Sequence, residues 1–245
     1  HQTVAAKEPG HLANQLLMGG TLRDYGRTLL SLSRMEEAFS MYQHAESTLI
    51  GLDVANLPEG AANKRTSLLA NVYSDLAIFY QKTSNVEQSI LTQEKAIALY
   101  TRVAEAAPDD VNKQERLAFA YHNQANVLSL VDPTEAIVIH RKGMDILKQL
   151  AEEHPGMPRR QLHLQGAYNN LGLMQVKTGE LADGIINIRI AVDGKTKLFE
   201  ENPGIPLYEE SLANSYMILS EALYASGETE KSVIESKHGI DLLNN

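Results

Sequence analysis

The chain has 245 residues and a formal net charge of −9, from 22 lysines and arginines against 31 aspartates and glutamates. Apolar residues make up 43% of it and charged residues 22%, which is the balance of a folded globular protein. An acidic chain repels phosphate backbones and anionic lipids, so nucleic acid and membrane surfaces are disfavoured as partners. The sequence contains no cysteine, which excludes disulfides, cysteine-ligated metals and thiol nucleophiles. No apolar run approaches the ~18 residues of a spanning helix, so no membrane insertion is expected.

Small residues recur with a period near 48 residues. Three columns share this register: Gly26, Ala77, Ala125, Gly172 and Ser220; then Ala38, Ser89, Ala136, Gly184 and Ser232; then Ala45, Ala96, Gly143, Ala191 and Gly239. Four residues before each member of the first column stands Leu22, Tyr73, Tyr121, Tyr168 or Tyr216. Small residues on one helical face let a neighbouring helix approach closely. The columns therefore predict a repeated pair of packed helices.

Helical spacing and capping signals place ten helices along the chain. In chain order they are expected at 11–31, 35–52, 62–82, 86–106, 111–130, 134–153, 159–177, 181–201, 206–225 and 229–243. Prolines mark the joints between pairs, at Pro58, Pro108, Pro155 and Pro203. Within pairs, Ser84–Glu87 is interpreted as a capping box, Asp132 as the cap before Pro133, and Gly179 and Gly227 as helix ends.

This pattern resembles the tetratricopeptide repeat (TPR) family. The resemblance is most specific at Tyr168-Asn169-Asn170-Leu171-Gly172, followed by Thr178-Gly179-Glu180 and Ala191. It implies an all-α fold of about five antiparallel hairpins in a right-handed superhelix. The hairpins are expected at 11–57, 58–107, 108–154, 155–202 and 203–245 within one domain, after a linker or disordered start at 1–10. The long period also looks like the ~48-residue TPR arrays appended to some bacterial serine/threonine kinases, although no kinase motif is present.

A search for chemistry in the sequence leaves no catalytic residue, metal ligand or cofactor to propose. Met18-Gly19-Gly20-Thr21 lacks the lysine of a phosphate loop and is interpreted as a helix kink or joint. The eight histidines lack a metal-binding spacing, and Arg141 and Lys142 beside His140 disfavour a cation there. Asp109 and Asp110 follow a proline and are interpreted as the start of a helix.

The TPR resemblance implies a concave groove lined by the first helix of each hairpin. The candidate groove residues are Arg23, Arg27, Asn71, Ser74, Phe119, His122, Asn126, Asn169, Asn170 and Asn214. Asparagine carboxamides both donate and accept hydrogen bonds, so the stripe could bind a peptide backbone. The alternative is that these asparagines are merely polar residues tolerated on a solvated concave surface. Only Arg23 and Arg27 match the basic positions of the family's carboxylate clamp.

We therefore expect a non-enzymatic scaffold that binds a partner protein or peptide. A regulatory or sensor segment of a larger signalling protein, such as a bacterial serine/threonine kinase, is the main alternative. A small-molecule or enzymatic role is a third alternative, which needs converging titratable residues in one cavity and would be supported by a deep pocket around His122. The last expected helix keeps Val233, Ile234, Ile240, Leu242 and Leu243, so a homodimer through this C-terminal helix is also considered.

Overall fold

The computed structural model describes residues 9–53 and 57–244, and within them it contains ten α-helices and no strand. The helices are α1 (Pro9–Ser31), α2 (Met35–Ile50), α3 (Glu59–Lys82), α4 (Val86–Glu105), α5 (Val111–Leu128), α6 (Pro133–Glu153), α7 (Pro158–Lys177), α8 (Leu181–Glu201), α9 (Pro206–Ala225) and α10 (Thr229–Leu243). The predicted helices are confirmed, and no boundary differs by more than three residues. Of the predicted linker at 1–10, residues 1–8 lie outside the described ranges, and Pro9 opens α1.

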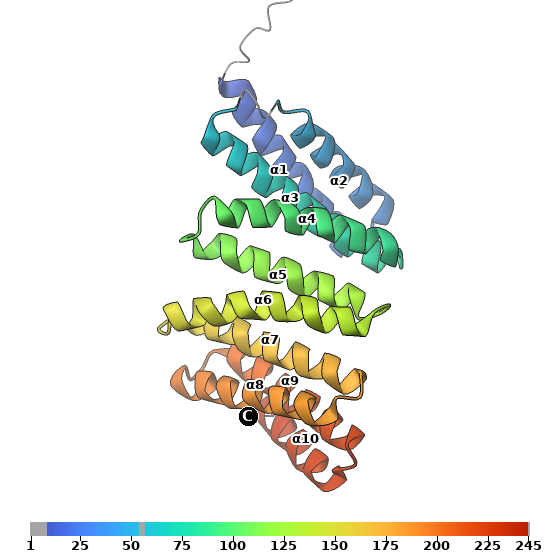
Figure 1. Ribbon diagram of the computed structural model, residues 1–245, viewed down its shortest axis with the longest axis vertical. Coiled ribbons are helices and arrows are strands. Elements are labelled where there is room, and N and C mark those ends of the chain that lie inside the picture. Colours follow the sequence, from blue (N-terminus) through green and yellow to red (C-terminus); the bar gives the residue numbers. More distant parts are fainter. Residues whose placement is uncertain (1–8, 54–56, 245) are drawn as a thin grey trace, which may run out of the picture. The chain divides into compact units, whose positions relative to one another are not determined.

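Consecutive helices pair as hairpins, and we call the first helix of each pair an A helix and the second a B helix. The pairs α1–α2, α3–α4, α7–α8 and α9–α10 pack along their lengths (Figure 1). In the remaining pair, His122 on α5 contacts His140 on α6. The chain forms two compact units, unit 1 at residues 1–120 and unit 2 at residues 121–245, with the boundary inside α5. The single continuous domain over 11–245 stays a prediction.

The three columns of small residues all lie inside, as predicted, since each of their fifteen members is buried. A Cβ added to Gly172 would lie 2.6 Å from the carbonyl oxygen of Gly184, so α7 and α8 touch backbone to backbone there. In the second hairpin the hydroxyl of Ser89 donates to the carbonyl of Ala77 at 2.8 Å. The first two columns therefore face each other across each of these hairpins.

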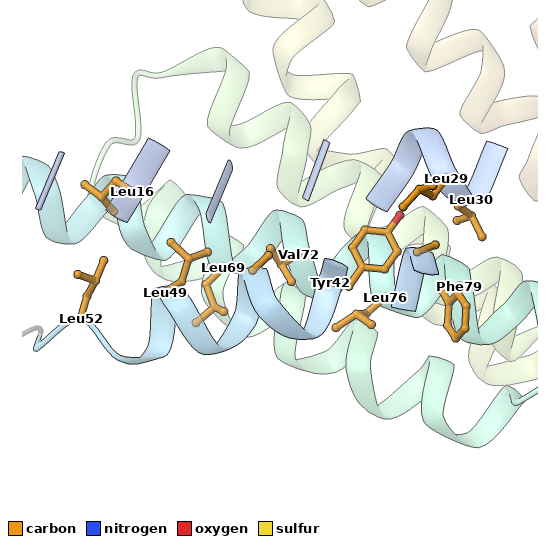
Figure 2. Close-up of a cluster of buried hydrophobic side chains, with 12 residues drawn as sticks. Leu16, Leu29, Leu30, Tyr42, Leu49, Leu52, Leu69, Val72, Leu76 and Phe79 are labelled. Atoms are coloured by element: carbon orange, nitrogen blue, oxygen red, sulfur yellow. The ribbon is translucent and has the colours of Figure 1, made fainter. Parts of the chain in front are cut away.

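Apolar side chains fill the space between α1, α2 and α3 in unit 1. Figure 2 shows this cluster, in which Leu16, Leu29, Tyr42, Leu49, Leu69, Val72 and Leu76 are buried together. The ring of Phe79 stacks on that of Phe39 with centroids 5.1 Å apart. Gly19 lies inside α1 rather than at a joint. The absence of a side chain at Gly19 makes room for the side chain of Leu49.

The joints and caps follow the local chemistry of the chain with one correction. Pro58, Pro108, Pro155 and Pro203 lie between hairpins, as predicted. Asp132 caps α6 by accepting from the backbone of Glu135 at 3.0 Å, and Asp110 caps α5 by accepting from Asn112 at 3.1 Å. The capping box at Ser84 is wrong. Ser84 has a left-handed φ of 59°, and the cap of α4 is Asn85, which accepts from Gln88.

No helix in the described part of the chain combines the length and apolar character needed to cross a bilayer.

Candidate functional site

All ten predicted groove residues lie on A helices, but the structure divides them by exposure. Arg27, Asn126, Asn170 and Asn214 are exposed; Arg23, Ser74 and Phe119 are half-buried; Asn71, His122 and Asn169 are buried. The exposed members can meet a partner directly. The polar groups of the buried members instead contact neighbouring helices.

Arg23 joins α1 to α3 in unit 1. Its Nε donates to Asp75 Oδ2 at 2.6 Å, and the two side chains are 18% and 11% exposed. Burial raises the pKa of the Asp75 carboxyl, while the positive charge and hydrogen bond of Arg23 oppose that rise. Arg23 is therefore the partner of a buried carboxylate, and Arg27 is the exposed cation one turn further along α1.

Asn71 joins α3 to two other helices of unit 1. Its Oδ1 accepts from the Tyr100 hydroxyl on α4 at 2.7 Å and from Arg116 Nη1 on α5 at 2.9 Å. Burial also raises the pKa of the Tyr100 hydroxyl. The Asn71 carbonyl oxygen is thus already satisfied by two donors.

Two histidines form a buried pair in unit 2. His122 Nδ1 on α5 lies 3.0 Å from His140 Nδ1 on α6, and His140 Nε2 lies 2.8 Å from the carbonyl oxygen of Ala167 on α7. A carbonyl only accepts, so we assign the His140 hydrogen to Nε2, which makes His122 Nδ1 the donor of the other bond. His122 Nε2 is then a buried acceptor with no partner among the described residues.

Both imidazoles of this pair are held neutral. Burial lowers the pKa of His122 to about 3, and the neighbouring His140 adds to that shift. Burial also lowers the pKa of His140, helped by Arg141 and opposed by the bond to Ala167. A protonated pair would place positive charge in this buried position, so the contact is made for neutral rings.

A buried lysine forms a second polar cluster in unit 2. Lys195 on α8 is 4% exposed, and its Nζ donates to Ser215 Oγ at 2.7 Å and to the Ser211 carbonyl at 3.1 Å. Asn169 Nδ2 on α7 donates to the same Ser215 Oγ at 2.6 Å. Burial lowers the pKa of Lys195 to about 8. The cluster therefore fastens α7, α8 and α9 together.

The Lys195–Ser215 pair has the side-chain types of an activated nucleophile but not its accessibility. A lysine with a depressed pKa within hydrogen-bond reach of a serine can act as a general base. Ser215 is fully buried, however, so no substrate can reach its hydroxyl. An open pocket of about 290 Å³ lies elsewhere in unit 2, where α8, α9 and α10 meet, and is lined by Phe199, Tyr216 and His238 among others. No predicted groove residue lines it.

The inward polar residues of the B helices were missed by the sequence analysis, although the repeat register contains the signal. In the first four hairpins, the residues three positions before the third small column are Tyr42, Gln93, His140 and Ile188, all buried. Gln93 donates to the Ala120 carbonyl at 3.0 Å, the counterpart of the bond from His140 to Ala167. Four residues after that column, Lys195 occupies the position of Leu49, Tyr100 and Leu147. A lysine in an otherwise apolar or aromatic register marks a buried cation.

Comparison with known proteins places the fold. No family model matches the sequence, and no curated protein matches it. Among solved structures, BtubC (BKLC) from P. vanneervenii is similar at 14% identity and a TM-score of 0.67, over 95% of this chain and 91% of that one. The apo form of RapI is similar at 13% identity and a TM-score of 0.68, over 92% of this chain and 70% of that one. Aspartyl phosphate phosphatase F from Bacillus subtilis is similar at 18% identity and a TM-score of 0.67, over 95% of this chain but 52% of that one.

TPR-like repeats from a putative kinesin light chain of Podospora anserina are also similar, at 18% identity and a TM-score of 0.56, over 91% of this chain and 92% of that one. The chain thus has an all-α repeat fold of the TPR type.

Proposed function

We propose that the chain is a protein-interaction scaffold that binds a partner peptide or protein along its A helices. The supporting observation is a set of part-buried or buried polar bonds between consecutive A helices: Arg23 to Asp75, Arg116 to Asn71, and Asn169 to Ser215. Hydrogen bonds that are shielded from water fix the helices that carry them, so the exposed side chains beside them are held in register within each unit. A surface fixed in advance binds with a smaller entropic cost.

The exposed residues suit an extended peptide. Asn126, Asn170 and Asn214 can each donate to and accept from a main chain. Phe119 is a half-buried aromatic that can receive one side chain of the partner. The net charge of −9 favours a basic or neutral partner, while Arg27 in unit 1 suits an acidic residue of that partner.

A peptide-display selection on the purified chain, followed by fluorescence anisotropy with the selected peptides, tests this proposal. The variant with Arg27→Ala, Asn126→Ala and Asn214→Ala should lose affinity by at least ~10-fold, because it removes a cation and two carboxamides from the proposed surface. The matched control, Lys142→Ala with Gln43→Ala and Gln88→Ala, removes the same group types from exposed positions of B helices. Equal loss in both variants, or in neither, would place the binding face away from the A helices.

The regulatory alternative uses the same surfaces and adds a flanking signalling domain such as a serine/threonine kinase. The sequence of the whole gene would distinguish this alternative from a free-standing scaffold.

Self-association through α10 is a second part of the proposal. Val233, Ile234, Ile240 and Leu243 on this helix are 50–64% exposed, which is unusual for four large apolar residues on one 15-residue helix. A second copy of the chain that covers them would remove this apolar surface from water. Sedimentation of the chain over a concentration series measures it, and a constant monomer mass would contradict it.

A further inference from the structure

Each B helix presents the same face to the A helix that follows it. Gln93 and His140 donate to the carbonyls of Ala120 and Ala167, and Lys195 donates to Ser215. The residues at the register of Gln93 are buried in four B helices, and so are those at the register of Lys195. At a junction between hairpins, this face of a B helix therefore packs against a face of the next A helix.

The last B helix presents that face without a following A helix in the described residues. Its four positions, which we call the α10 end face, are Val233, Ser236, Ile240 and Leu243. Leu243 is 60% exposed, whereas Leu49, Tyr100, Leu147 and Lys195 at the same register are at most 6% exposed. Ile240 is 50% exposed, whereas at its register Met144 and Val192 are buried and Glu46 and Ile97 are half-buried.

The first A helix presents the opposite half of a junction. Its four positions, which we call the α1 end face, are Met18, Thr21, Tyr25 and Thr28, and all four are exposed. Met18 is 55% exposed, whereas Leu69, Leu117, Leu164 and Leu212 at its register are at most 8% exposed. Tyr25 is 49% exposed, whereas Leu76, Gln124, Leu171 and Leu219 at its register are at most 7% exposed.

The two end faces match each other in chemistry as well as in register. Neither contains a charged residue, as is typical of the centre of a protein interface. Ser236 stands at the register of Gln93 and His140, and Thr21 stands at the register of the alanines whose carbonyls they bind. At this register the α10 end face therefore offers a short hydroxyl group, Ser236 Oγ, which contacts Met217 Sδ at 4.0 Å within its own chain.

We propose that the α1 end face of one copy docks on the α10 end face of another, so that the chain self-associates head to tail. The inference rests on the self-association through α10 proposed above and names the surface of the second copy that covers it. A contact between unlike faces leaves one free face at each end, so it adds further copies rather than stopping at a symmetric dimer.

Two blocked variants test the pairing by analytical ultracentrifugation of the full chain. Met18→Glu with Tyr25→Glu blocks the α1 end face, and Val233→Glu with Ile240→Glu blocks the α10 end face. All four side chains are exposed, so both variants should keep the circular dichroism of the wild type. Wild-type mass should rise past that of a dimer with concentration, and each variant alone should associate at least ~100-fold more weakly.

The decisive sample is an equimolar mixture of the two variants. Each then retains the face that the other lacks, so the mixture should form a complex with the mass of two chains and no more. Val138→Glu with Ile186→Glu, at exposed apolar positions of α6 and α8 outside both end faces, should associate like the wild type.

Other results overturn the inference. If the variant blocked on α1 still dimerises, and the mixture forms no complex beyond those of the separate variants, α10 pairs with itself. Only the proposed self-association then survives. If the wild type is monomeric throughout, the inference and the proposed self-association both fail.

Discussion

In unit 1 the bond from Arg23 to the next A helix is an ion pair, whereas in unit 2 Asn169, at the same register, makes a neutral bond to Ser215. The difference extends to the B helices. At the register of Gln93, unit 1 has the neutral side chains of Tyr42 and Gln93, while unit 2 has the apolar Ile188 and also His140, an imidazole kept neutral by burial. One backbone register therefore accepts several chemistries, and the two units should respond differently to side-chain volume, charge and pH.

The largest expected effect is steric and belongs to unit 2. Gly172→Ala places a Cβ 2.6 Å from both the Gly184 carbonyl and Ile188 Cγ1, so α7 and α8 must move apart. We expect a loss of about 3 kcal/mol in the free energy of unfolding, measured by urea denaturation. Gly166→Ala on the same helix has nothing within 4 Å of the added Cβ and should stabilise by about 0.5–1 kcal/mol. Similar effects of the two changes would show that the close contact is not rigid.

Arg23→Ala probes the ion pair of unit 1. It leaves the Asp75 carboxylate buried without its partner, which should cost about 2–3 kcal/mol of unfolding free energy. The double variant Arg23→Leu with Asp75→Leu removes both charges and should recover most of that loss. Equal stabilities for the single and double variants would mean that Asp75 is well solvated without Arg23.

Acid should act on the histidine pair of unit 2. The pKa of His122 is about 3 in the folded chain and near 6.5 when unfolded, so the unfolded state binds more protons between these values. This contribution to stability is complete above pH 6.5 and falls as the pH drops toward 3, by about 2 kcal/mol at pH 5. His122→Gln removes this titrating imidazole and should flatten the pH dependence of the urea midpoint. An unchanged slope would place the acid sensitivity elsewhere.

Lys195→Leu restores the side chain found at Leu49 and Leu147. The pKa of Lys195 is about 8 when folded and near 10.5 when unfolded, so the folded chain carries a cost below pH 8 that disappears as the pH rises to 10.5. The variant should gain about 1–2 kcal/mol at pH 7 and little at pH 10.5. A destabilised variant at pH 7 would show that the bonds to Ser211 and Ser215 outweigh the burial of charge.

The smallest effect concerns the turns inside hairpins. Ser33 and Ser84 in unit 1 have a left-handed φ of 59°, where unit 2 has Gly179 and Gly227. Ser84→Gly should therefore stabilise by about 1 kcal/mol, and Gly179→Ser should destabilise by a similar amount, in thermal melts. If both changes shifted the stability in the same direction, the left-handed φ of Ser84 would not be a source of strain.

Local chemistry explains why the helices were predictable and the polar contacts were not. Prolines, glycines and caps such as Asp132 act on adjacent backbone, so they locate helix ends without knowledge of packing. The small columns persist because backbone contacts such as Gly172 to Gly184 tolerate no large side chain.

The direction of the groove residues depends on neighbours far along the chain. Asn71 and Asn169 were expected on a peptide-binding stripe, but Arg116 and Ser215, 45 and 46 residues away, occupy their side chains. The periodicity of residue types does not reveal such pairings, because the partners differ from one hairpin to the next.

The register shared by Gln93 and His140 also has a use in engineering. A glutamine and a histidine make the same bond there, 27 residues along the chain in both cases, but only the histidine can take up a proton. The number of imidazoles placed at this one position would then set how many protons an array absorbs when it opens. An array of such hairpins could be programmed, hairpin by hairpin, to come apart at a chosen acidity while its outer surfaces stay unchanged.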